Sequence, residues 1–168
     1  MHSLYLVRHA VAADQGSWAQ PDEVRPLTEF GWQQALAIAQ LLNLAQAQVF
    51  KSSPTVRCRD TLVPAAHTAG LVVEDAPDLF EQAAPSSSDA ARQMLRGLID
   101  SYFADGTRVA AACSHGNVLL PLLEATASGA GARCPKGGVW KLDVDRGGVT
   151  SVSFLGRLVP ATGKWEVR

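Results

Sequence analysis

A chain of 168 residues suits one compact domain, and its 47% hydrophobic and 18% charged residues are typical of a globular protein. No apolar stretch approaches the roughly 20 residues that span a bilayer, so nothing supports a membrane role. The formal net charge of −1 gives no global attraction to nucleic acid or anionic lipid, and the expected partner is therefore small.

The amino-terminal segment and the cysteines indicate a cytoplasmic protein. Met1–Ala13 has no basic leader followed by a long apolar run, so we expect an opening strand rather than a signal peptide. Cys58, Cys113 and Cys134 are few, odd in number and without a Cys-x-x-Cys spacing, which argues against a disulfide framework and a structural zinc site. We expect residues 1–168 to form a single domain in a reducing cytoplasm.

Strands and helices are predicted to alternate in the first half of the chain. The apolar run Ser3–Val7 is typical of a buried strand, and it delivers Arg8 and His9 at its carboxyl end. Thr28 is expected to cap a helix over residues 29–42. The further elements predicted here are a strand over 47–51, a helix with Ser53 as its cap and Pro54 as its first residue that Gly70 ends, and a strand over 71–74.

The second half continues this alternation. Its predicted elements are a loop over 77–88, a helix over 89–103, a strand over 108–113, a turn at Ser114-His115-Gly116-Asn117 and a helix over 118–126. After the Gly-rich linker Ser128–Gly138, strands over 139–144 and 149–155 flank Asp145-Arg146-Gly147-Gly148, a hairpin signal. The pattern predicts an α/β fold with a mainly parallel sheet covered on both faces.

Three of the predicted strand ends carry groups suited to phosphoryl chemistry. Ligands of open α/β sheets bind beyond the carboxyl ends of the strands, where Arg8, His9, Arg57 and His115 are expected to meet. Each guanidinium can donate two hydrogen bonds to phosphoryl oxygens. A neutral imidazole can attack phosphorus, so we expect His9 to be the nucleophile and a protonated His115 to stabilise the transferring group.

Four sequence blocks carry a family resemblance. They are Leu6-Val7-Arg8-His9-Ala10, Arg25-Pro26-Leu27-Thr28 with Gly31 and Gln34-Ala35, Ser52-Ser53-Pro54 with Arg57 and Thr61, and Ser114-His115-Gly116. In this order and spacing the chain resembles the histidine phosphatase superfamily, the phosphoglycerate-mutase-like proteins. Its short length and its Arg-His-Ala variant resemble the small bacterial phosphohistidine phosphatases, and the phosphatase domain fused to some actinobacterial Nudix hydrolases. Ala10 departs from the family's usual glycine.

The resemblance implies a fold and a set of site residues. The fold is a three-layer α/β/α sandwich, and the enzyme is a metal-independent cytoplasmic phosphatase. His9 is then the residue that becomes phosphorylated, with Arg8, Arg57 and His115 as the rest of the phosphate pocket. Glu81 lies where many members place their acidic proton donor, although a solvent-exposed loop carboxylate is the alternative. The chain has no room for the long capping insertions of larger members, which predicts a shallow, open site.

The expected reaction is hydrolysis of a phosphomonoester, a phosphoramidate such as phosphohistidine, or a phosphoanhydride, through phospho-His9 and without a cofactor. The partner would be a small phosphorylated substrate or a phosphohistidine protein. One alternative is a nucleotide di- or triphosphate hydrolase that uses the same site. Another is a non-catalytic phosphate-binding signalling module, against which the complete set of site residues argues, since binding alone needs no nucleophile. The roles of Arg25, Asn117 and Lys136 stay open between contact with substrate and structural support.

Overall fold

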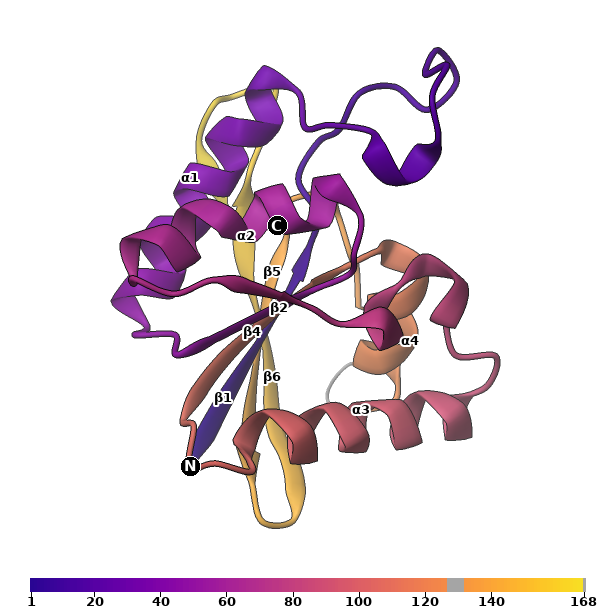
Figure 1. Cartoon of the computed structure of the whole chain (residues 1–168). Helices are drawn as coiled ribbons and strands as arrows, with labels where there is room; N and C mark the ends of the chain where they lie inside the picture. Colours follow the sequence, from indigo (N-terminus) through magenta and orange to yellow (C-terminus); the bar gives the residue numbers. More distant parts are fainter. Residues whose placement is uncertain (127–131, 168) are drawn as a thin grey trace.

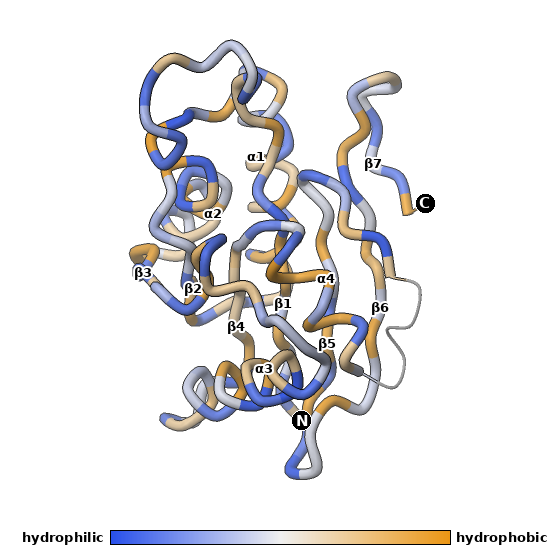
Figure 2. Tube along the Cα trace, turned by 90° about the vertical axis from the view of Figure 1, so that its right-hand side faces the viewer, coloured by the Kyte–Doolittle hydropathy of each residue, from blue (hydrophilic) through white to orange (hydrophobic). Residues whose placement is uncertain are grey.

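The computed structural model describes residues 1–126 and 132–167. One seven-stranded sheet has the order β3-β2-β4-β1-β5-β6-β7, which runs from left to right in Figure 2. Four strands pair in parallel: β1 (His2–Arg8), β2 (Val49–Ser52), β3 (Val73–Asp75) and β4 (Val109–Ser114). Three strands extend the sheet in antiparallel pairing: β5 (Val139–Asp145), β6 (Gly148–Leu158) and β7 (Trp165–Glu166).

Four helices cover the two faces of this sheet, which confirms the predicted three-layer α/β/α architecture (Figure 1). The helices are α1 (Glu29–Leu44), α2 (Val56–Thr68), α3 (Ser88–Phe103) and α4 (Gly116–Glu124). Successive strand residues point to opposite faces, so Leu4 and Leu6 of β1 pack with α3 and α4, whereas Tyr5 and Val7 pack with α1 and α2. The short 3-10 helices η1 (Asp22–Val24), η2 (Pro77–Leu79) and η3 (Glu81–Ala83) lie in the connections.

The predicted cap of the first helix and the predicted end of the second helix are confirmed. The Thr28 hydroxyl accepts a hydrogen bond from the amide of Gly31 at 3.0 Å, so Thr28 is the N-cap of α1. Gly70 follows α2 with a φ of 70°, and the Gly70 and Leu71 amides satisfy carbonyls of the last turn. The left-handed backbone at this position is the reason for glycine there.

The predicted start of the second helix is wrong. The helix begins at Val56 with Thr55 as its N-cap, rather than at Pro54 with Ser53 as its cap. The amide of Ser53 donates to the Cys113 carbonyl at 2.9 Å, so the backbone still follows the direction of β2 at this point. The Ser53 side chain is therefore free of a capping role, and it contacts His115 instead.

Other boundaries differ by a few residues from those predicted. The third strand is Val73–Asp75, because Leu71 and Val72 are exposed residues of the connection before it. The connection over 77–88 contains η2 and η3, and β7 was not predicted. The predicted linker Ser128–Gly138 lies partly outside the described residues.

The loop after β1 is attached to α1 by a very close backbone approach. The amide and the hydroxyl of Thr28 both donate to the Val11 carbonyl, at 3.0 and 3.2 Å. A Cβ atom on Gly31 would lie 2.0 Å from that same carbonyl oxygen, so only glycine fits. This contact fixes the first residues beyond His9, before the chain extends away from the sheet as the indigo loop of Figure 1.

Among the described residues, no helix is both long and apolar enough to span a membrane.

Candidate active site

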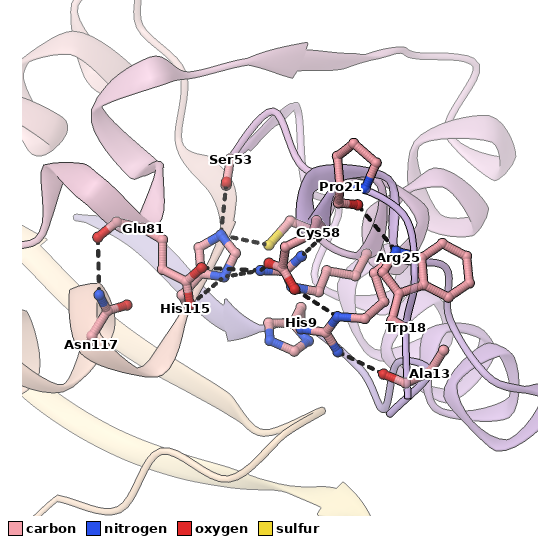
Figure 3. Close-up of polar contacts among 12 residues, drawn as sticks. His9, Ala13, Trp18, Pro21, Arg25, Ser53, Cys58, Glu81, His115 and Asn117 are labelled. Atoms are coloured by element: carbon pink, nitrogen blue, oxygen red, sulfur yellow. Dashed lines mark hydrogen bonds and ion pairs between the residues drawn. The ribbon is translucent and has the colours of Figure 1, made fainter. Parts of the chain in front are cut away.

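Two histidines meet where β1 and β4 end. In the parallel pairing of these strands Arg8 lies opposite Ser114, and the amide of His9 donates to the Ser114 carbonyl at 3.0 Å. The two following imidazoles, of His9 and His115, therefore project from adjacent strands, with ring centroids 5.5 Å apart and planes at 61° (Figure 3). Both residues are buried, with exposed fractions of 5% and 1%. The two imidazoles thus lie close together at the carboxyl ends of their strands, as the sequence predicted.

The surroundings of His9 keep its imidazole neutral. Burial is the largest effect that lowers its pKa; the hydrogen bond to Ala10 opposes it, and the charges of Arg57, His115 and Arg8 lower it further, to about 3. Nδ1 lies 2.8 Å from the Ala10 carbonyl oxygen. Since a carbonyl can only accept, Nδ1 carries the proton, and Nε2 keeps a free lone pair. A neutral imidazole with this tautomer is suited to nucleophilic attack.

The Arg57 guanidinium contacts His115 and the two carboxylates of the site, those of Asp22 and Glu81. It projects from the first turn of α2 and is only 1% exposed. Its Nη2 atom is 3.4 Å from Nδ1 of His115 and 3.2 Å from Oε2 of Glu81. Four of the five predicted site residues therefore lie together. Arg57 contacts both His115 and Glu81, and the His9 ring lies against that of His115.

Asp22 is a member of the site that sequence reasoning did not find. Its Oδ2 atom lies 2.8 Å from Nη2 of Arg57, and its carbonyl oxygen accepts from Nη1 of Arg57, also at 2.8 Å. Oδ1 pairs with Nε of Arg25 at 2.8 Å, and Arg25 donates to the Ala13 carbonyl (Figure 3). Burial acts to raise the pKa of Asp22, but Arg25 and Arg57 outweigh it and hold that pKa below its usual value. The only sequence signal for this role was the spacing of Asp22 three residues before Arg25, which permits an ion pair between them.

His115 is held from behind by α2 and the segment that precedes it. Its Nε2 atom lies 2.9 Å from the Ser53 hydroxyl and 3.5 Å from Sγ of Cys58. These contacts occupy one ring nitrogen and leave Nδ1 facing Arg57 and Glu81. Ser53 and Cys58 therefore orient the imidazole, which is a positioning contribution that the sequence did not reveal.

Glu81 lies at the open side of the cluster. Its side chain is 42% exposed, and its Oε1 atom is 3.7 Å from Nδ1 of His115. The Asn117 side chain donates to the Glu81 carbonyl at 2.9 Å, which anchors the start of η3 to α4. Glu81 thus combines contact with the buried cluster and access to solvent, as a proton donor requires.

Arg8 lies on the α4 side of the site. Its Nη1 atom donates to the Cys134 carbonyl at 2.5 Å, and its guanidinium packs against Gly116, where a Cβ atom would lie 3.0 Å from Cζ. Within the described residues it makes no hydrogen bond to His9, Arg57 or His115, and two guanidiniums can share a bound phosphoryl group without one. Its positive charge nevertheless acts on His9 and on Lys136, whose pKa is lowered by burial and then by Arg8, Arg25 and Arg57.

The arrangement suits an oxyanion with several negatively charged oxygens. Guanidiniums and imidazoles surround an unprotonated nitrogen, and such groups stabilise a transferring phosphoryl group electrostatically. The described residues contain no group of three His, Cys, Asp or Glu side chains placed to hold a metal ion. The fold and the site together define an α/β enzyme of phosphoryl transfer.

Comparison with known proteins identifies the family. Residues 4–94 match the model of the histidine phosphatase superfamily, branch 1. The chain belongs to this superfamily, and it is a phosphatase of the histidine phosphatase class.

Solved structures of this fold resemble the chain over nearly its whole length. A SixA protein from Agrobacterium tumefaciens is 23% identical, with a TM-score of 0.70 and coverage of 95% of this chain and 98% of the other. The protein histidine phosphatase SixA in complex with tungstate is 20% identical, with a TM-score of 0.69 and coverage of 96% and 99%. A mycobacterial glucosyl-3-phosphoglycerate phosphatase in complex with VO3 is 20% identical, with a TM-score of 0.67 and coverage of 92% and 98%.

Proposed function

We propose that the chain hydrolyses a phosphomonoester, a phosphoramidate such as phosphohistidine, or a phosphoanhydride through a covalent intermediate on His9. The observation that carries this proposal is the state of that imidazole: its Nδ1 proton is donated to the Ala10 carbonyl, and its pKa is lowered to about 3. Nε2 is therefore unprotonated at neutral pH, beside Arg57 and His115. The single sheet in which β1 to β7 take part supports the further proposal that residues 1–168 form one domain.

The reaction has two steps. In the first, Nε2 of His9 attacks phosphorus, the bond from phosphorus to the leaving group breaks, and Glu81 gives a proton to a leaving group that needs one. Arg57, His115 and the charge of Arg8 stabilise the phosphoryl oxygens. In the second step water attacks phosphorus, the phosphorus–nitrogen bond breaks, and Glu81 takes the proton from water. Inorganic phosphate leaves, and His9 is neutral again.

Two classes of substrate have support from relatives. SixA is named a protein histidine phosphatase, and the mycobacterial relative a glucosyl-3-phosphoglycerate phosphatase. These names support a phosphohistidine protein and a small phosphorylated molecule as candidate partners. A cytoplasmic setting is part of the same proposal, and the three free cysteines suit it. Nucleotide di- or triphosphates remain the alternative substrate for the same site.

The test uses His9→Ala with His67→Ala as its control, because His67 is an exposed residue of α2. We expect His9→Ala to abolish release of phosphate from a chromogenic ester, while His67→Ala keeps full activity. The activity of His67→Ala should also persist in excess chelator, since the proposed reaction uses no metal ion. A phosphate label that is labile in acid and stable in base should form on the wild type and not on His9→Ala. Label on a serine or on His115 would overturn the assignment.

A further inference from the structure

A second cavity adjoins the candidate active site on its α4 side. It has a volume of about 630 Å³, and Arg8, Arg133 and Arg157 are among its lining residues, with Gly116 and Asn117 from the start of α4. Two of its lining residues connect it to the catalytic cluster. Arg8 directly precedes His9 in the chain, and the Asn117 side chain donates a hydrogen bond to the Glu81 carbonyl. A group bound in this cavity would therefore lie beside a phosphoryl group bound at His9.

The positive charges of this cavity are not compensated. None of its three arginines takes part in an ion pair within residues 1–126 and 132–167. The Nε atoms of Arg8 and Arg157 are buried and have no acceptor in the described structure. A buried donor without an acceptor is costly, and an arginine is suited to a carboxylate or a phosphate in that place.

The other lining groups add no negative charge. Burial raises the pKa of the Cys134 thiol to about 11, against the opposing pull of Arg8, so the thiol is neutral at pH 7. Gly116 and Asn117, which line the cavity, are the first two residues of α4 and lie at the positive end of its dipole. The charged side chains of the cavity thus favour an anion.

We propose that this cavity is a subsite for an anionic group, a carboxylate or a phosphate, carried by the leaving group of a small phosphorylated substrate. Its volume is in the range of small-molecule sites. Arg8 lines both the phosphoryl site and this subsite, while Arg133 and Arg157 would contact the leaving group only. This inference rests on the proposed phosphatase function and narrows it to substrates with a second negative charge.

The experiment compares pairs of substrates that differ only in the second anion. Glycerol 3-phosphate and 3-phosphoglycerate differ in a carboxylate, and 3-hydroxypropyl phosphate and propane-1,3-diyl bisphosphate differ in a phosphate. We expect the wild type to prefer the anionic member of at least one pair in kcat/KM, and the pair that shows the preference identifies which anion fits.

The variants are Arg157→Gln and Arg133→Gln. We expect Arg157→Gln to lower the preference about 10-fold or more, the effect of a buried charge-assisted hydrogen bond, and the exposed Arg133→Gln to lower it about 3-fold. Arg157→Lys should keep part of the preference. Arg146→Gln, which removes an exposed charge in the β5–β6 hairpin, should leave it unchanged. Equal preference in the wild type and Arg157→Gln, or no preference in either pair, would overturn the proposal.

Binding separates this inference from the proposed function. In His9→Ala, calorimetric titration should show tighter binding of the anionic member, and addition of Arg157→Gln should remove the difference. Such a result supports the subsite even where the wild type turns over none of these esters. The lack of turnover would then count against the proposed function and not against the subsite. Equal affinity for both members in His9→Ala would contradict the subsite.

Discussion

Asp22 holds Arg57 through two separate oxygen atoms, its carboxylate Oδ2 and its backbone carbonyl, each 2.8 Å from a guanidinium nitrogen. Nη1 and Nη2 are also the donors that a guanidinium offers to phosphoryl oxygens. Because the Asp22 carboxylate and a phosphoryl group are both anions, substrate must compete with Asp22 for the same donors.

Replacement of Asp22 by Asn should therefore strengthen binding of anions. We expect the inhibition constant of inorganic phosphate to fall about 3- to 10-fold in Asp22→Asn, a modest factor because the carboxylate is partly exposed and screened. Glu23→Gln removes an exposed neighbouring charge and should have little effect. Weaker phosphate binding in Asp22→Asn would instead mean that Asp22 mainly holds Arg57 in position.

Arg57→Ala should lower kcat/KM about 10- to 1000-fold, the usual effect of removing charge-assisted donors at a transition state. Arg59→Ala is the matched control, since Arg59 lies on the same helix and pairs with Asp75 at the surface. Steady-state kinetics on one chromogenic ester checks both variants. A similar small loss in the two would place Arg57 outside the reaction.

Glu81→Gln should separate substrates by their leaving groups. An alkyl alcohol needs a proton as it departs, so we expect its release to slow about 100- to 10,000-fold, while nitrophenolate should depart almost unaffected. Measurement of kcat/KM for both esters in wild type and variant gives the result. Equal slowing of both would indicate that Glu81 organises Arg57 and His115, and no slowing of either would make it a bystander.

The lowered pKa of His9 also makes the fold sensitive to acid. His9 ionises near 6.5 in an unfolded chain and at about 3 in the native one, so as pH falls below 6.5 the unfolded state binds the proton first. This effect should remove about 2 kcal/mol of unfolding free energy between pH 6.5 and pH 5. Denaturant unfolding of wild type and His9→Asn at several pH values measures it, and the wild type should lose more stability than the variant. Parallel curves for the two proteins would contradict a depressed pKa.

Gly31→Ala and Gly97→Ala should change stability in opposite directions. A Cβ atom on Gly31 would lie 2.0 Å from a backbone oxygen, which costs about 1–3 kcal/mol or more as the loop after His9 shifts. Gly97 is in α3 with open space around it, so alanine there should add up to about 1 kcal/mol. Thermal unfolding of both variants checks this pair. An unchanged Tm for Gly31→Ala would show that the loop moves freely.

The residues that lie at strand ends were the most predictable part of the site. His9 and His115 follow apolar runs whose hydrophobic pattern indicates buried strands, and the parallel arrangement then brings their ends together. The family match over 4–94 includes His9 and ends before His115, so the placement of His115 rests on the strand pattern.

Contacts made by loops could not be predicted in the same way. Asp22 reaches Arg57 from a 3-10 helix that has no hydrophobic periodicity, and Ser53 carries a polar pattern that favours a cap equally well. Arg8 sits at a strand end, but whether its guanidinium turns toward Arg57 or toward α4 depends on the carbonyl of Cys134, which is far away in sequence.

The pairing of β1 with β4 has a consequence for the time at which the site comes into being. One imidazole belongs to residue 9 and the other to residue 115, and a single interstrand ladder sets their separation. During synthesis His9 is made first and has no partner strand until the segment Val109–Ser114 has followed it. Under the proposed mechanism, phosphoryl transfer therefore requires that this long-range pairing has formed.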